Sequence, residues 1–143
     1  MGSILSIDYG LKRVGLAISD ENKSFAFPLS VIENNGTKKL INKIKEIILE
    51  RDIDLIVVGM PFNMDKTKGE MAEKVEVFVK LLKKETNKTI ETVDERLTSF
   101  VALENLKETK LKGKKLRKYI DSESARLILQ EFLEGYNGRH DGT

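Results

Sequence analysis

The chain contains no cysteine, and His140 is its only histidine among 143 residues. Without cysteine it cannot form disulfides, thiolate zinc sites or a cysteine nucleophile, and such a composition suits a reducing compartment. A single histidine in a glycine-rich C-terminal segment cannot supply a Ser-His-Asp or Cys-His arrangement, so no catalytic role is expected for His140. Any hydrolytic chemistry must therefore be carried by other groups.

Long apolar runs are also absent. The most apolar stretch, Ile53–Phe62, is interrupted by Asp54 and Pro61 and is too short to span a bilayer. The residues before Asp8 have neither the basic start nor the apolar core of a signal peptide. The sequence therefore predicts a cytoplasmic protein with no membrane association.

The length and composition are those of one globular domain. Hydrophobic residues make up 40% of the chain and charged residues 34%, a balance typical of a folded protein. No repeat or linker divides it, so we place the domain at residues 1–134. Residues 135–143, which include three glycines, are expected to form a flexible tail.

The net charge is only +2, but its distribution is uneven. The segment Lys107–Lys118 holds seven basic residues and one acidic residue, Glu108, and the rest of the chain has a net charge of −4. Such a local patch suits phosphate binding, and Lys112, Lys114 and Lys115 are its candidate substrate contacts. A solvated lysine-rich loop explains the composition equally well.

Hydrophobic periodicity predicts an α/β fold. Short runs rich in branched residues predict five strands, at Ile4–Asp8, Val14–Ser19, Phe25–Ile32, Leu55–Gly59 and Thr89–Val93. Apolar residues at helical spacing predict four helices, around Leu40–Ile48, Met71–Leu82, Thr98–Leu106 and Ala125–Leu133. The first three strands follow one another as an antiparallel meander, and crossover helices then add two parallel strands. The expected result is a five-stranded mixed sheet flanked by helices.

Three carboxylates stand out against this plan. Asp8 ends the first strand and Glu95 follows the last, and binding sites of such sheets collect at the carboxyl ends of central strands. Asp121 begins the stretch that carries the final apolar stripe. Each has a structural explanation too. Asp8 can start a turn, Glu95 can pair with Arg96, and Asp121 can cap the final helix.

Taken together, the three residues point to metal chemistry. An unpaired carboxylate at the end of an apolar strand is costly, and three clustered carboxylates repel one another unless a cation neutralises them. Oxygen ligands of this kind suit Mg²⁺ or Mn²⁺. Two such ions about 4 Å apart activate water and stabilise a leaving alkoxide without a side-chain nucleophile. We therefore predict Asp8, Glu95 and Asp121 as metal-binding and catalytic residues.

Other polar groups are candidates for substrate contacts. Asn63, in the loop that leaves the fourth strand, offers an amide at the same end of the sheet. Lys12 and Arg13, in the first hairpin, can contact a phosphate backbone, and Arg96 can either fix Glu95 or contact phosphate. A plain turn accounts for the loop and for the hairpin equally well.

Four segments in register resemble the YqgF family of RNase H-like nucleases, also described as RuvX-like Holliday junction resolvases. They are Ile7–Ala17 with Ser19-Asp20, Val58–Asp65, Asp94–Ser99, and Ile120-Asp121 with Ala125, Ile128 and Leu129. The resemblance runs from about Ile4 to Leu133. Lys66 stands where the family often has glycine, and Ser124 where alanine is common.

This resemblance implies an RNase H-like sheet of strand order 3-2-1-4-5, with Asp8, Glu95 and Asp121 as its acidic triad. It further implies an endonuclease that matures the 5′ end of 16S ribosomal RNA precursors or, alternatively, cuts branched DNA. The implied partners are structured RNA, branched DNA and the ribosomal particle. Either a monomer or a homodimer is compatible with the sequence.

Two other classes compete. Sugar-kinase and actin-like ATPases share a first-strand Asp-x-Gly hairpin but need a second lobe, which this chain does not supply. A non-catalytic nucleic-acid-binding module could use the segment Lys107–Lys118 alone. Its binding would depend strongly on salt and would tolerate loss of the three carboxylates.

Overall fold

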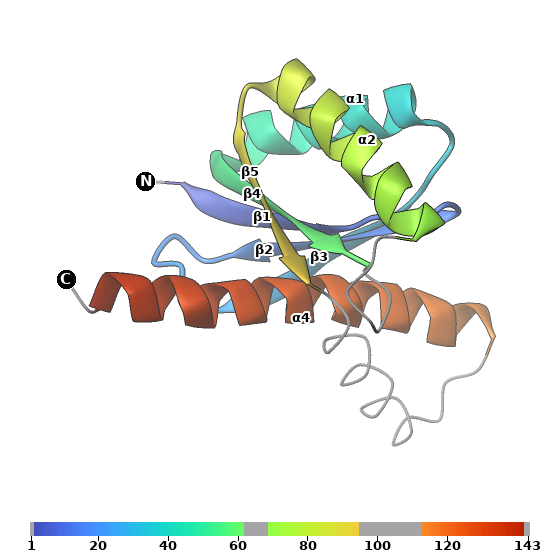
Figure 1. Cartoon of the computed structure of the whole chain (residues 1–143). Helices are drawn as coiled ribbons and strands as arrows, with labels where there is room; N and C mark the ends of the chain where they lie inside the picture. The colour runs from blue at the N-terminus through green and yellow to red at the C-terminus, as the bar shows by residue number, and fades with distance from the viewer. Residues whose placement is uncertain (1, 62–68, 95–112, 142–143) are drawn as a thin grey trace.

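The structure is a computed structural model that describes residues 2–61, 69–94 and 113–141. Five strands form one mixed sheet (Figure 1): β1 Ser3–Asp8, β2 Arg13–Ser19, β3 Ala26–Glu33, β4 Ile53–Met60 and β5 Thr89–Asp94. Three long helices accompany them: α1 Thr37–Arg51, α2 Glu70–Thr86 and α4 Lys114–Asp141. Each predicted strand is confirmed to within one or two residues, because branched apolar runs bounded by turn residues mark strands clearly.

The order of the strands, β3-β2-β1-β4-β5, confirms the predicted topology. The pairs β1–β2 and β2–β3 are antiparallel, and β1–β4 and β4–β5 are parallel. Pro28 lies on the edge strand β3, beside the register shift of the β2–β3 ladder, and both are positions where a sheet tolerates proline. Because β1, β4 and β5 run in the same direction, their carboxyl ends share one edge of the sheet.

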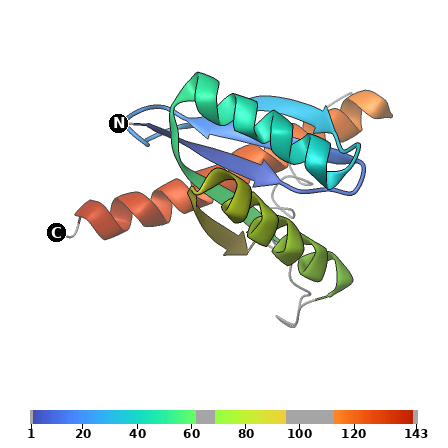
Figure 2. The ribbon, with the colours of Figure 1, turned by 90° about the horizontal axis from the view of Figure 1, so that it is seen from above.

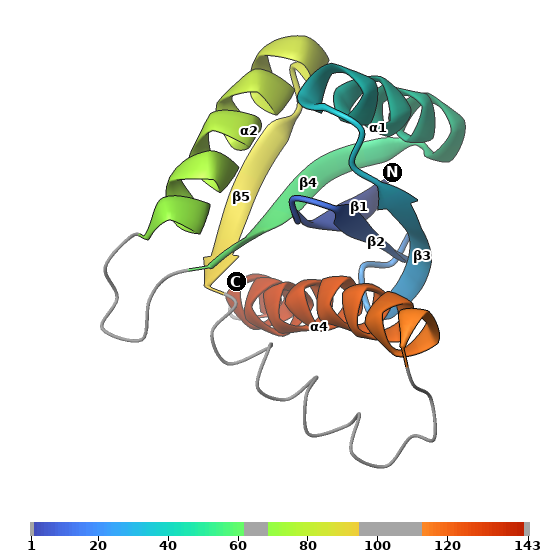
Figure 3. The same ribbon diagram turned by 90° about the vertical axis from the view of Figure 1, so that its right-hand side faces the viewer.

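Helices cover both faces of the sheet. Helices α1 and α2 lie on one face, and α4 lies across the other (Figures 1 and 3). Seen from above, α4 passes beneath the strands at an angle to them (Figure 2). None of the helices in the described ranges is long and apolar enough to cross a membrane.

Two cores result, one on each face. The larger packs β1, β2 and β4 against α1 and α2, with Phe78 and Leu16 among its fully buried side chains. The smaller packs the same strands against α4 through Ile4, Val57 and Leu129. Because side chains alternate along a strand, every residue of β1 belongs to one face or the other.

Helix α4 differs from the sequence-based prediction at both ends. It begins at Lys114, seven residues before Asp121, so the interpretation of Asp121 as its N-cap is wrong. The chain enters it through Gly113, whose φ of 67° suits a turn directly before a helix. The helix then continues through Gly135 to Asp141, and Tyr136 still packs on the smaller core. The tail at 135–143 was expected to be flexible, which stays a prediction, as does the domain boundary at residue 134.

Candidate active site at the carboxyl end of the first strand

Asp8 is the last residue of β1 and belongs to the face that α4 covers. Its strand neighbours of the same parity, Ile4 and Ser6, both contact α4: Ile4 packs in the smaller core, and the Ser6 hydroxyl donates a 2.9 Å hydrogen bond to the Ala125 carbonyl. Period-two alternation therefore places the Asp8 side chain on the same face. Asp8 is half-buried. Sequence reasoning predicted this position at a strand end.

Tyr9, the residue after Asp8, packs on the opposite face of the sheet, against α2. The ring of Tyr9 packs against Phe78 of α2, with their centroids 4.7 Å apart. The two faces of the sheet thus hold the chain on either side of the point where β1 ends. This fixes the Asp8 backbone more firmly than an exposed turn would.

Gly15 brings Asp121 to the same place. It pairs with Asp8 across the β1–β2 ladder, and a Cβ added at Gly15 would collide with the carbonyl oxygen of Asp121. Residues directly opposite in an antiparallel pair have Cα atoms about 5 Å apart. The backbones of Asp8 and Asp121 therefore lie within roughly 10 Å of each other, on one face of the sheet.

Arg13 holds the side chain of Asp121. The Arg13 Nε donates a 2.7 Å hydrogen bond to Oδ2 of Asp121, and the two groups form an ion pair between β2 and α4. The side chains keep 35% and 22% of their exposure, so water screens the pair and its contribution to stability is below about 1 kcal/mol. Its main consequence is geometric, because it fixes the direction in which the carboxylate points.

The other predicted site residues divide into two groups. Lys12 is exposed in the β1–β2 turn, where its carbonyl accepts the Asn34 N–H, and Lys115 is exposed near the start of α4. Outside the described residues lie Glu95, Asn63, Arg96 and Lys112, together with the side chain of Lys114 and the helix expected at Thr98–Leu106. Their predicted roles stay predictions.

Neighbouring charges on α4 are engaged elsewhere. Glu123 accepts hydrogen bonds from Arg126, and this contact raises the pKa of the Arg126 guanidinium. Burial, then the nearby carboxylates Asp94 and Glu134, raise the pKa of Glu131. Glu131 lies ten residues beyond Asp121, about 15 Å along the helix. At physiological ionic strength that separation exceeds the Debye length, so Glu131 has little influence on Asp121.

The donor set at this site fits a hard divalent cation. Asp8 and Asp121 both present oxygen, the ligand atom that Mg²⁺ and Mn²⁺ prefer. Within the described ranges no group of three acidic or histidine side chains comes together.

Sequence reasoning missed the residues that position the site. A glycine inside an otherwise apolar strand signals close backbone approach, and Gly15 was the available signal. Ser6, which is fully buried in β1, holds α4 through its bond to Ala125. In the sequence, Ser6 is a polar residue between two apolar ones, and the usual alternation of apolar and polar residues along a strand explains that pattern equally well.

Comparison with known sequences gives a consistent result. Residues 2–135 match the family described as "RuvX: Holliday junction resolvase". Curated relatives named "Putative pre-16S rRNA nuclease" include one from Endomicrobium trichonymphae, 43% identical over 94% of this chain and 96% of the relative. Another, from Maridesulfovibrio salexigens, is 39% identical over 91% of this chain and 96% of the relative.

Solved structures show the same fold. RuvC of Thermus thermophilus in complex with a Holliday junction superposes with a TM-score of 0.61 at 14% identity, over 96% of this chain and 97% of that one. The fowlpox virus resolvase in complex with Holliday junction DNA superposes with a TM-score of 0.55 at 16% identity, over 94% and 98%. The fold is therefore the RuvC-like RNase H fold that the resemblance implied.

Proposed function

Because the chain belongs to the RuvX family and is thus a hydrolase of phosphodiester bonds, we propose that it is a metal-dependent endonuclease that matures the 5′ end of 16S ribosomal RNA precursors. The relatives named above carry that substrate in their names. The observation that supports the chemistry is the convergence of Asp8 and Asp121 through Gly15. The proposed setting is the cytoplasm, with the ribosomal particle as a partner.

The proposed site consists of Asp8 and Asp121 with Glu95, the residue that follows β5. When bound, Mg²⁺ or Mn²⁺ activates water and stabilises the charge of the leaving oxygen. Asp8 would hold the cation from a strand and Asp121 from a helix, so the way α4 crosses the sheet sets how these two residues lie relative to each other. Arg13 orients the Asp121 carboxylate. Its charge, together with that of Lys12, attracts the phosphate backbone.

Replacement of Arg13 by alanine separates the effect of its charge on metal affinity from its effect on the orientation of Asp121. Removal of a cation beside a metal ligand strengthens metal binding, so the Mn²⁺ dissociation constant of the Arg13→Ala protein is expected to fall about threefold to tenfold. Its cleavage rate at saturating metal is expected to fall about tenfold, because Asp121 is no longer oriented. Calorimetric Mn²⁺ titration and single-turnover cleavage measure the two.

Lys80, exposed on α2 across the sheet, is the matched control. The Lys80→Ala protein should match the wild type in both measurements. A wild-type cleavage rate in Arg13→Ala at saturating metal would contradict the assigned role of Arg13, because Asp121 would then be oriented without it.

The substrate is tested by direct comparison. A precursor RNA that carries the 16S 5′ end and a four-way DNA junction are incubated with the protein at equal concentration, with Mg²⁺ or Mn²⁺. We expect cleavage of the RNA at a defined position and slower or no cleavage of the junction. Resolution of the junction with no cleavage of the RNA would overturn the substrate assignment and favour the resolvase function.

A further inference from the structure

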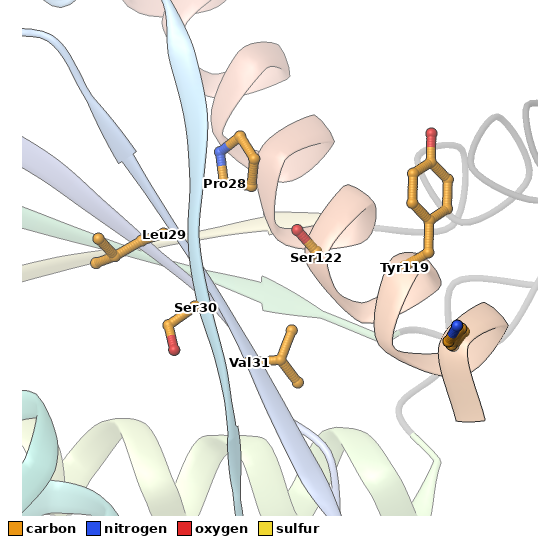
Figure 4. A pocket seen from close by; sticks show the side chains of 7 residues that line it. Pro28, Leu29, Ser30, Val31, Tyr119 and Ser122 are labelled. Atoms are coloured by element: carbon orange, nitrogen blue, oxygen red, sulfur yellow. The ribbon is translucent and has the colours of Figure 1, made fainter.

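A groove separates the edge strand β3 from the first half of α4. It has a volume of about 420 Å³, with Pro28 to Val31 on the strand side and Lys115, Tyr119 and Ser122 on the helix side. Pro28 and Val31 project from β3 toward the helix, and Ser122 projects from α4 toward the strand (Figure 4). The strand side of the groove is thus mainly apolar, and the helix side carries an amine, a phenol and a hydroxyl.

The groove begins beside the candidate active site. Ser122 directly follows Asp121, and Lys115 lies six residues before Asp121, about 9 Å along the axis. A chain bound along the groove would therefore meet Asp121 at one end. On the strand side, Val31 also lies near Asp121, because Val31 pairs with Gly15 on β2 and Gly15 contacts the Asp121 backbone.

The charges at the start of α4 are arranged against the helix itself. Four of its first five residues are basic (Lys114, Lys115, Arg117 and Lys118), and its first turn contains no acidic residue. Cations at a helix N-terminus oppose the positive end of the helix dipole. Lys115, whose side chain is exposed, therefore lies where a bound phosphate would be stabilised both by the lysine and by the helix N-terminus.

Tyr119 adds a second kind of contact. Its side chain retains 37% exposure although large aromatic residues are usually well buried. It lies four residues after Lys115 and three before Ser122, on one stripe of the helix. Its ring stands away from the helix with the hydroxyl outermost (Figure 4). An exposed ring next to basic groups is the combination that binds single-stranded nucleic acid, since bases stack on the ring and cations contact phosphates.

We propose that this groove binds the single-stranded RNA segment that flanks the scissile phosphate, with one base stacked on Tyr119 and a phosphate at Lys115. The proposal rests on the proposed function in that the bound strand is taken to be the substrate. Bases of an unpaired segment can stack on an aromatic side chain, whereas bases inside a duplex are already stacked on one another. The groove would therefore require an unpaired segment next to the cut, and this makes Tyr119 a specificity-determining residue.

The test measures binding without cleavage. A fluorescein-labelled single-stranded RNA of about twelve nucleotides is titrated with protein in EDTA, and anisotropy gives the dissociation constant. We expect Tyr119→Ala to weaken binding about 5- to 100-fold and Tyr119→Phe to keep it, because the ring and not the hydroxyl stacks. Lys115→Ala should reduce the slope of log K against log salt by about 0.7.

Phe27 supplies the matched aromatic control. It is 51% exposed on the same strand β3, but it pairs with Ile18, which packs on the α1–α2 side of the sheet. Phe27→Ala should bind the RNA as the wild type does. In a parallel experiment, RNA carrying a photoreactive 4-thiouridine should crosslink to Tyr119 and not to Phe27, a result that a merely structural role for Tyr119 would not produce.

Several outcomes would overturn the proposal. Unchanged binding by Tyr119→Ala is one, and equal losses in Tyr119→Ala and Phe27→Ala are another. A concentration-dependent dimer that Tyr119→Ala abolishes, with RNA binding intact, would assign the groove to a second copy of the chain. Because no step requires metal or cleavage, failure here is distinguishable from failure of the proposed nuclease activity.

Discussion

Asp8→Asn is expected to lose metal-dependent cleavage almost completely while the protein keeps its fold and its affinity for RNA. Asparagine has nearly the same shape but no charge, so it cannot neutralise a divalent cation. Partners that only orient metal ligands typically contribute 10- to 100-fold to activity. A ligand itself should therefore contribute at least about 100-fold, measured as the single-turnover rate at saturating Mg²⁺. Mn²⁺ binding measured by calorimetry should weaken in parallel.

Asp52→Asn is the control for the loss of one negative charge. Asp52 caps α1 with a φ of 51°, which asparagine tolerates, and it lies at the amino end of β4, at the opposite edge of the sheet from Asp8. This variant should cleave RNA at the wild-type rate. Cleavage by Asp8→Asn at the wild-type rate would refute the proposed site. Loss of RNA binding as well as cleavage would contradict the expectation that Asp8 acts through the metal alone.

Gly15→Ala should damage both stability and activity, and activity more. The added Cβ meets the Asp121 backbone rather than a flexible side chain, so α4 must shift away from the sheet. Overpacking of this kind costs about 1–3 kcal/mol, or several degrees in the midpoint of thermal unfolding. Because the same shift moves Asp121 relative to Asp8, cleavage should fall by about 100-fold even where the protein is fully folded.

Gly135→Ala provides the matched comparison. Gly135 lies in the same helix, and a Cβ added there meets nothing within 4 Å. Alanine has the higher helix propensity, so this variant should be as stable as the wild type or slightly more so. Thermal unfolding by circular dichroism and cleavage at a temperature well below both midpoints check the pair. If Gly15→Ala kept the wild-type midpoint and rate, the close approach of α4 would not govern the site.

The sheet could be predicted because its signals are local. The continuous apolar run Leu55–Gly59 indicated a strand buried on both faces, and β4 is such a strand. The start of α4 could not be predicted, since Asp121 before an apolar stripe has the pattern of an N-cap. Residues 114–120 are about two turns long and contain four basic residues, so their three apolar residues, Leu116, Tyr119 and Ile120, did not identify a helix, although one forms there.

The sequence by itself limited the chemistry and located one candidate residue. Absence of cysteine and the single histidine left carboxylates as the candidate reactive groups, and Asp8 was correctly predicted at the end of an apolar strand. Only the tertiary structure decided how Asp121 joins it. The two residues are more than a hundred positions apart in the chain, and no local pattern encodes their separation. That separation is set by a glycine that lets a helix backbone touch the sheet, by the buried Ser6 bond and by Arg13.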